Sequence, residues 1–402
     1  MILFCMFLAA LNLVNRYYYC IYIAAILFVL TPRRKVRINK SVFALLAFSV
    51  AMLLFNPDSQ DTILDMIKPF TFPLCYIVGF GLFQNREQEK IDVIQEEKRI
   101  ASVIYVLSGG AMVHFLLNAM LNRESEDRNV IDFWTNSQMS ATAQAALACL
   151  GLAVAITFLF VKTEKRKKYI AVATIFLILL YNLILAGRTL FVLSAILCVV
   201  SLLYVRTVEK RKMHKSIIVV AAAACLIIVA YNHNLFGIKG ALEETNFYRR
   251  FFGGVVTEEI ESNARMQHKL AYLKHALDYL WGGGNIRSLY GHSAHDLYLD
   301  TYDESGIIAL CAIVVYIGFS LGRLVLCLKN NMISLETRLL VFCIYLVCNL
   351  YFWMEPIIRG IPWLLASYCF VDGAVAYLLF RLDAQQSWDD ASIFQKDRNE
   401  LA

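Results

Sequence analysis

The stretch YIAVATIFLILLYNLILAGRTLFVLSAILCVVSLLYV, residues 169–205, contains one charged side chain, that of Arg188. It divides into two apolar runs, 169–186 and 189–205, and a cluster of basic residues precedes the first run. Apolar runs of about 15 to 25 residues bounded by charge are typical of helices that cross a lipid bilayer. This stretch therefore predicts two membrane-spanning helices.

Similar runs recur along most of the 402 residues, of which 59% are hydrophobic and only 17% charged. Soluble proteins have about 45 to 50% apolar and about 25% charged residues, so the composition predicts an all-α polytopic membrane protein. We expect twelve spans, with eleven as the alternative because Asn12, Asn15 and Arg16 interrupt the first apolar stretch. The predicted spans are 2–14, 17–30, 41–55, 67–83, 100–121, 139–161, 169–186, 189–205, 216–232, 306–328, 339–354 and 361–380.

The distribution of charge predicts how these spans are oriented. Segments 31–40, 162–168 and 206–215 are rich in Lys and Arg, which is typical of cytoplasmic loops, whereas the alternate loops are acidic or nearly uncharged. These basic loops account for the net charge of +6 without a nucleic-acid partner. No cleavable targeting peptide is expected. The chain thus divides into predicted spans one to nine (1–232), an extracytoplasmic segment (233–305), spans ten to twelve (306–380) and a cytoplasmic tail (381–402).

All eleven cysteines fall in predicted spans, and none lies in the extracytoplasmic segment 233–305. This placement argues against a disulfide framework or a cysteine-ligated zinc site there. We expect these cysteines to serve as small apolar side chains.

Chemistry is expected in segment 233–305, which holds five of the seven histidines. Residues 264–281 carry an apolar helical stripe, and Gly282 to Gly284 should stop the helix. Two interpretations remain: an interfacial helix whose polar side meets water, or a helix that points Arg265 into a cleft. The stripe consists of Met266, Leu270, Leu273, Leu277 and Leu280.

The stretch GHSAHDLYLDTYDESG, residues 291–306, reads as a turn followed by a helix. Ser293 is the expected cap, with Asp296 at the capping-box position and His295 in the first helical turn. There the helix dipole favours a neutral imidazole, as a general base requires. Alternatively, His292 and His295 only line a wet loop. Two histidines at this spacing, without a third ligand, are a weak metal signal.

Arg188 lies between two apolar runs, where a charge faces either a cavity or the membrane interface. The predicted topology puts Arg188, Arg265 and His295 on the same side of the membrane. Guanidinium groups bind a diphosphate bidentately, and a neutral imidazole can take a proton from a hydroxyl. Together these groups favour glycosyl transfer from a diphosphate-linked lipid.

With these residues, the chain resembles the bacterial O-antigen polymerase and O-antigen ligase superfamily. The resemblance rests on the span plan and on NARMQHKLAYLKHAL, WGGGN and HSAHDLYLDTYDESGIIAL, together with LAGRTL around Arg188. Asp296 departs from the family pattern, which usually has Asn at that position. The matching positions are Arg188, Arg265, Gly282 to Gly284, His295, Tyr298, Leu299, Glu304 and Gly306.

The resemblance implies a polymerase of undecaprenyl-diphosphate-linked repeat units for O-antigen or capsule, located in the bacterial cytoplasmic membrane. His295 would be the base and Arg188 and Arg265 would hold the donor diphosphate, in an inverting transfer without metal or other cofactor. Flippase and chain-length regulator proteins are implied partners, besides the lipid-linked oligosaccharide and the bilayer. Further substrate-binding candidates are Arg249, Arg250, Arg287, His292 and Tyr298.

Three alternatives stay open at this stage. The first concerns the acceptor. In a polymerase it would be another lipid-linked repeat unit, whereas in a ligase it would be lipid A core or a wall polymer. A lipid-linked oligosaccharide flippase also fits about twelve spans, although transporters of charged substrates usually carry ionisable residues in several spans and these spans have few. A metal-dependent glycosyltransferase would need acids in an early outside loop, where the chain offers Asn15 and Arg16.

Overall fold

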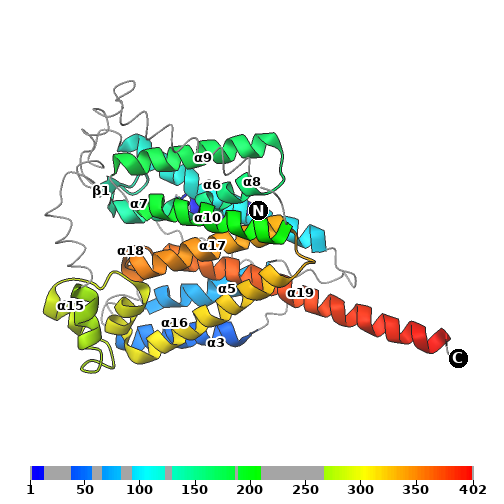
Figure 1. Cartoon of the computed structure of the whole chain (residues 1–402). Coiled ribbons are helices and arrows are strands. Elements are labelled where there is room, and N and C mark those ends of the chain that lie inside the picture. The colour runs from blue at the N-terminus through cyan, green and yellow to red at the C-terminus, as the bar shows by residue number, and fades with distance from the viewer. Residues whose placement is uncertain are drawn as a thin grey trace, which may run out of the picture.

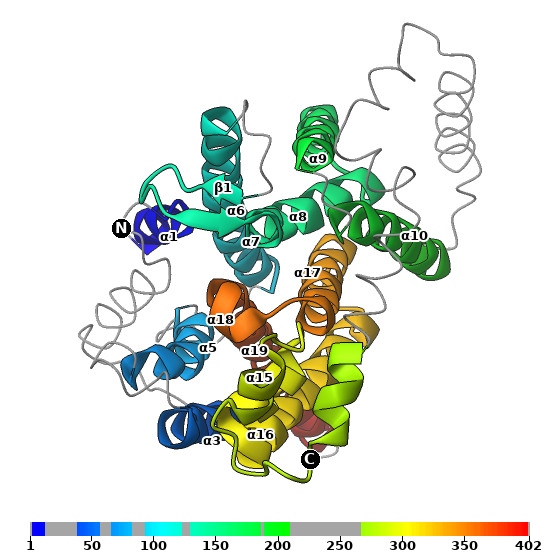
Figure 2. The ribbon, with the colours of Figure 1, turned by 90° about the vertical axis from the view of Figure 1, so that its left-hand side faces the viewer.

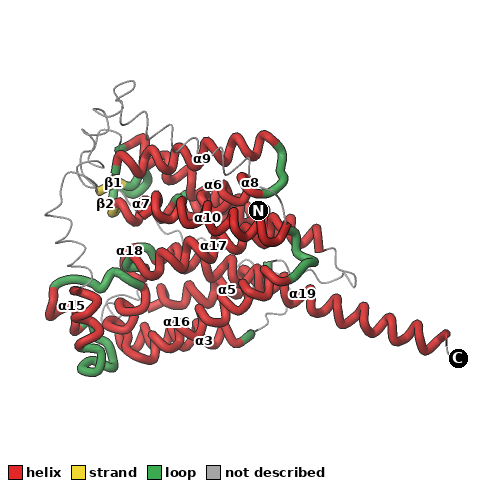
Figure 3. The backbone as a smooth tube through the Cα atoms, viewed as in Figure 1, coloured by secondary structure: helices red, strands yellow, loops and turns green. Residues whose placement is uncertain are grey.

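The computed structural model describes residues 2–12, 38–56, 66–82, 93–122, 129–185, 189–209 and 267–400, with side chains as far as Gln385. Most of these residues are helical, and the helices form one bundle (Figures 1 and 3). The predicted all-α class is therefore confirmed. Predicted spans 17–30 and 216–232 lie outside the described residues.

The elements follow the apolar runs of the sequence. The helices are α1 (Ile2–Ala10), α3 (Lys40–Phe55), η2 (Lys68–Phe70), α5 (Thr71–Gly81), α6 (Val93–Leu121), α7 (Ala141–Leu147), α8 (Cys149–Phe160), α9 (Lys165–Ile184), α10 (Thr189–Glu209), α15 (Asn285–Tyr290), α16 (Leu297–Lys329), α17 (Leu335–Met354), α18 (Ile357–Gly360) and α19 (Pro362–Glu400). Strands β1 (Asn129–Ile131) and β2 (Gln138–Ser140) form an antiparallel hairpin.

Six described helices are long and apolar enough to cross a membrane: α6, α9, α10, α16, α17 and α19. The α7 and α8 pair, bent by 44°, makes a seventh if it is counted as one span. Helix α3 is a shorter apolar helix of 16 residues, and α1 and α5 are shorter still. The predicted number of twelve spans thus stays a prediction.

Glycines bring several helices into close contact. A Cβ added at Gly79 of α5 would lie 2.0 Å from the carbonyl oxygen of Phe370, and one at Gly373 of α19 would lie 2.1 Å from that of Tyr76. The two backbones therefore touch through a reciprocal glycine pair, as is common where helices pack in lipid. Gly110 similarly lets α1 approach α6, because its added Cβ would lie 2.7 Å from the Ala10 side chain.

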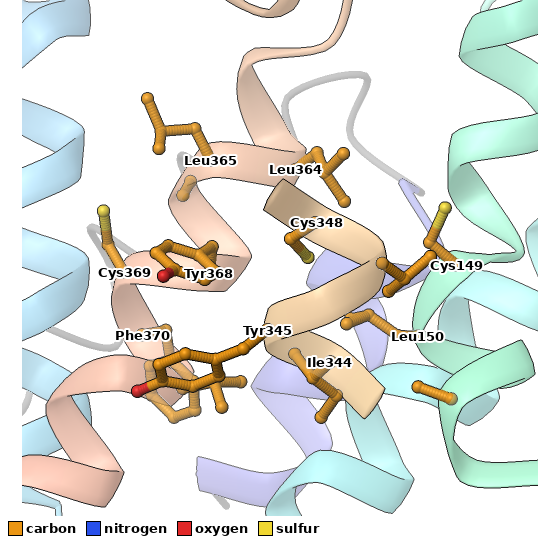
Figure 4. Packing of buried hydrophobic residues seen from close by; sticks show 14 of the residues in the cluster. Cys149, Leu150, Ile344, Tyr345, Cys348, Leu364, Leu365, Tyr368, Cys369 and Phe370 are labelled. Carbon is orange, nitrogen blue, oxygen red and sulfur yellow. The ribbon is translucent and has the colours of Figure 1, made fainter. Parts of the chain in front are cut away.

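A buried charge pair ties four helices together inside the bundle. Arg323 of α16 donates from Nε to Asp372 Oδ1 of α19 at 2.8 Å and from Nη1 to Ser41 Oγ of α3 at 2.7 Å. Tyr345 of α17 donates its hydroxyl to the same carboxylate at 2.7 Å. Figure 4 shows Tyr345 beside Tyr368, and their rings are 5.1 Å apart. The predicted spans 306–328 and 361–380 therefore contain a paired arginine and aspartate.

The β1–β2 hairpin is fixed to α6 by buried polar groups. His114 Nε2 lies 2.6 Å from Asp132 Oδ2, and both side chains are inaccessible to solvent. Burial opposes ionisation of Asp132, but the hydrogen bonds from His114 and Thr135 lower its pKa. Asn122 clamps the hairpin by bonding both the amide and the carbonyl of Ile131 at 2.8 Å. These groups hold the connection between α6 and α7.

The hairpin, α15 and α18 lie at one end of the bundle, here named the α15 end (Figure 1). The loops at residues 161–164 and 330–334 lie at the opposite end, and α19 projects beyond that end towards the C-terminus (Figures 1 and 3). Most predicted extracytoplasmic histidines thus gather at the α15 end. Of the nine described cysteines, all free thiols, six are buried as small apolar side chains.

Candidate functional site

The predicted helix 264–281 is helical over residues 267–274 and continues as turns to Trp281. Its leucine stripe faces away from the protein, with Leu277 83% exposed, whereas Tyr272 on the polar side is 1% exposed. At Tyr272 the polar side therefore packs against the protein instead of meeting water, whereas His275 on the same side is partly exposed. Arg265 and Met266 lie outside the described residues, so the cleft interpretation is still a prediction.

The polar side of this helix packs against the loop that carries His292. Tyr272 donates its hydroxyl to the His292 carbonyl at 2.8 Å, and the imidazole rings of His268 and His292 are stacked at 4.8 Å. Burial lowers the pKa of His268, and the neighbouring His292 adds to the effect. His268 is thus suited to the neutral form of its imidazole.

The glycine turn after Trp281 fits into a break in α16. Gly282, Gly283 and Gly284 have φ values of 82°, 90° and 68°, a region that other L-residues rarely adopt. Gly283 and Gly284 donate their amides to the carbonyls of Glu304 and Asp303, at 3.1 and 2.8 Å.

Gly306, with φ 77° and ψ −175°, interrupts α16 at this contact. Its added Cβ would lie 2.7 Å from the carbonyl oxygen of Leu280, so only glycine fits on this side as well. The break separates residues 297–305, which carry three acids, from the apolar remainder of α16. We take the membrane-spanning part of α16 to begin after Gly306.

Helix α16 begins three residues later than the sequence predicted. Asp296, not Ser293, is the N-cap, and its Oδ1 accepts from the Leu299 amide at 2.7 Å. His295 therefore precedes the cap with a left-handed φ of 57°, and the prediction that it lies in the first helical turn is wrong. It remains at the positive end of the helix dipole, which still disfavours imidazolium.

Asp296 has a second partner on the neighbouring helix. Its Oδ2 lies 2.9 Å from Lys269 Nζ, which also donates to the Trp353 carbonyl at 2.9 Å. Tyr298, in the first turn of α16, packs its ring 4.9 Å from that of Trp353. Asp296 thus links helix 267–274, α16 and the end of α17 directly beside His295.

Three further acids of α16 are buried next to the break. Asp300 Oδ1 accepts from the Ala294 amide at 2.8 Å, and burial raises the pKa of this carboxyl to about 7, with Asp296 and Asp303 adding to the effect. Asp303 caps α15, because its oxygens accept from the amides of Ile286 and Arg287 at 2.8 and 3.3 Å. Burial also raises the pKa of Asp303.

The third acid, Glu304, joins α16 to two other elements at the α15 end. Its Oε1 pairs with Nε of Arg359 on α18, and its Oε2 accepts from Asn56 Nδ2 at 3.4 Å. Sequence reasoning missed Arg359. The sequence pattern that singled out Arg188 would also have found Arg359, because each is a lone arginine in a short connection between two predicted spans.

Of the eight predicted site residues, four are described: Arg287, His292, His295 and Tyr298. They lie on one continuous stretch from α15 to the first turn of α16. Arg287 contributes its amide to Asp303, His292 its carbonyl to Tyr272, and Tyr298 its ring to Trp353. The remaining predicted site residues, which lie outside the described residues, are Arg188, Arg249, Arg250 and Arg265.

The described part of the chain contains no group of three or more His, Cys, Asp and Glu side chains that could hold a metal ion. What the described site offers is a half-buried imidazole, paired or buried carboxylates, and the cations of Lys269 and Arg359. Such an arrangement can accept a proton and bind an anionic group.

The whole sequence was compared with models of protein families and with curated proteins. No family model matches the chain, and no curated protein matches it.

Proposed function

We propose that the protein polymerises oligosaccharide repeat units that are linked to undecaprenyl diphosphate, by an inverting glycosyl transfer at the α15 end. The observation that carries the proposal is the position of His295. It stands before the buried cap Asp296, at the positive end of a helix, where a neutral imidazole is favoured. The similarity of this stretch to the O-antigen polymerase superfamily supplies the substrate class.

In the proposed reaction, an acceptor hydroxyl attacks the anomeric carbon of the donor sugar. The hydroxyl proton passes to His295, the bond from the anomeric carbon to the diphosphate oxygen breaks, and undecaprenyl diphosphate leaves as an anion. Arg188 and Arg265 would bind that diphosphate, because a planar guanidinium matches two phosphate oxygens at once. Arg249, Arg250, Arg287, His292 and Tyr298 are proposed to contact the substrate.

The contacts around His295 support this assignment. Asp296 already accepts from Leu299 and pairs with Lys269, so its carboxylate is committed to holding the loop. Arg359 pairs with Glu304 nearby in the fold and adds a cation to the same end. An anionic leaving group would therefore meet the N-terminus of α16, beside two cations that are each paired with a carboxylate.

The proposal is tested with purified protein in proteoliposomes that contain undecaprenyl-diphosphate repeat units, with the products separated as a ladder. We expect His295→Ala to lower the rate of extension by about 10²- to 10⁴-fold, the usual contribution of a general base. His275→Ala is the matched control, because His275 lies at the same end and its two ring nitrogens bond Asp278 and Tyr290. A normal ladder from His295→Ala would remove His295 from the catalytic role.

A ligase of the same superfamily shares this site and differs in its acceptor, so the same assay with the alternative acceptor separates the two. A lipid-linked oligosaccharide transporter is the second candidate function, and one observation favours it. Arg323 and Asp372 form a buried pair inside predicted spans, and intramembrane charges often mark transport pathways. Movement of the substrate across the bilayer without covalent extension would support the transporter.

A further inference from the structure

A groove opens at the end of the bundle opposite the candidate site. Helices α6, α8 and α9 and the start of α17 enclose a cavity of about 1000 Å³. Helix α8 packs against both α6 and α9, which stand apart from one another (Figure 2). From that end the groove continues along the side of the bundle, with α8 as its floor.

The groove is long enough for an acyl chain. Its lining runs along α6 from Glu97 to Met112, which is about 22 Å at 1.5 Å per residue. One leaflet of a bilayer contributes about 15 Å of hydrocarbon, half of the usual 30 Å core. The groove therefore spans the depth of one leaflet.

The walls of the groove are largely apolar. Val154 and Phe158 of α8 and Ile170 of α9 belong to the lining. Gly109 also lines the groove, and a Cβ added there would meet nothing within 4 Å. An apolar chain can therefore lie along α6 at this position without displacing protein atoms.

Two lysines stand at the mouth of the groove. Lys98 of α6 and Lys167 of α9 line it, and neither forms an ion pair within the described part of the chain. Lys167 lies over the Phe158 ring, 5.3 Å from its centroid.

The two carboxylates at the mouth are already occupied. Glu97 accepts from the Ser334 amide at 3.1 Å and from the Thr337 hydroxyl at 2.8 Å, and Glu336 accepts from Tyr105 at 2.7 Å. Both carboxylates keep their negative charge but are held by protein donors, so the ammonium groups of the two lysines are the groups at the mouth that can contact a phosphate. Helix α9 begins with the sequence KRKK at residues 165–168, which adds to the positive field.

We propose that this groove binds an anionic glycerophospholipid, with one acyl chain along α6 and the phosphate between Lys98 and Lys167. Basic pockets between membrane helices are suited to anionic headgroups, and each lysine near the headgroup strengthens binding about fivefold. The bound lipid would hold α6 and α9 at a fixed separation, at the opposite end of the bundle from His295.

The first test fills the apolar part of the groove. Delipidated protein in detergent is titrated with phosphatidylglycerol, and bound lipid is counted by native mass spectrometry. Gly109→Phe should lose the tightest bound lipid, with affinity lowered at least tenfold. Gly318→Phe is the matched control, because Gly318 is an exposed glycine of α16 whose added Cβ also meets nothing within 4 Å. Equal binding by both variants would overturn the proposal.

The second test removes the charges at the mouth. Lys98→Gln with Lys167→Gln should lower the affinity for phosphatidylglycerol about thirtyfold and leave that for phosphatidylcholine nearly unchanged. Lys165→Gln with Lys168→Gln, from the same basic segment but not in the lining, is the control. Equal losses in both double variants, or equal affinity of the unaltered protein for the two lipids, would contradict selection of a net anionic headgroup by these lysines.

Discussion

Asp296 shows how one side chain fixes the geometry beside the proposed base. Its two oxygens serve different partners, the Leu299 amide at the start of α16 and the Lys269 ammonium on the neighbouring helix. An asparagine can cap a helix as well as an aspartate, but it cannot form an ion pair. The negative charge of Asp296 is therefore needed for the ion pair with Lys269 and not for the helix cap.

This distinction predicts different results for two substitutions at the same position. Asp296→Asn should keep the cap and lower stability by less than about 1 kcal/mol, whereas Asp296→Ala loses both contacts and should cost about 1 to 3 kcal/mol. Thermal unfolding in detergent measures both variants. If Asp296→Asn were as unstable as Asp296→Ala, the ion pair would be the dominant contact and the cap a minor one.

Asp300 predicts a dependence of stability on pH. Its pKa is about 7 in the folded chain and close to 3.8 in the unfolded chain, so folding takes up a proton between these values. The contribution of Asp300 to stability should therefore be greatest below about pH 4 and should fall as the pH rises towards 7. The total loss is at most about 1.4 kcal/mol for each unit of difference between the two pKa values.

The control for this prediction is Asp300→Asn, which removes the ionisable group and keeps an acceptor for the Ala294 amide. The melting temperature is followed from pH 5 to pH 8 for both proteins. The decrease with rising pH should be smaller in Asp300→Asn. An identical decrease would show that other groups cause it.

At the scale of elements, the apolar runs were good predictors because lipid-length helices end where charge begins. Helix α17 and the apolar part of α16 follow predicted spans 339–354 and 306–328 closely. The described part of the helix predicted over 264–281 ends at residue 274, and the glycine turn that follows forms hydrogen bonds to a break in α16 some twenty residues further along the chain. Local periodicity contains no information about such a partner.

The contact between α5 and α19 predicts a steric effect. Gly79→Ala would place a methyl group 2.0 Å from the Phe370 carbonyl oxygen, so the helices must separate, at a cost of about 1 to 3 kcal/mol or more. Gly318→Ala, at an open position in α16, should instead be neutral or gain up to about 1 kcal/mol from helix propensity. Thermal unfolding of the two variants compares them directly, and similar melting temperatures would argue against a close contact at Gly79.

At the scale of the whole molecule, the sequence predicted the all-α class. It could not reveal the pairing of Glu304 with Arg359, because that contact joins residues far apart in the chain through tertiary packing. The same holds for Arg323 with Asp372, which the apolar character of the surrounding spans concealed. The expected convergence of Arg188 and Arg265 on His295 is still a prediction, since both arginines lie outside the described residues.

The Arg323 and Asp372 pair joins α3, α16, α17 and α19, so its loss should affect the whole bundle. Asp372→Ala leaves a buried guanidinium without its carboxylate, which should lower stability by about 3 to 5 kcal/mol. Adding Arg323→Met removes the orphaned charge and should recover most of that loss, because two apolar residues can replace a buried ion pair at little cost. Asp383→Ala, at an exposed position of α19, controls for loss of a carboxylate on the same helix.

Recovery in the double variant also separates a structural role from a transport role. If the pair only holds the helices together, the double variant should be stable and should still extend the polysaccharide in proteoliposomes. If it lies on a transport pathway, the double variant should be stable but should no longer move the lipid-linked substrate across the bilayer. A double variant as unstable as Asp372→Ala would mean that the cost comes from lost contacts of Asp372 with Tyr345 rather than from the unpaired charge.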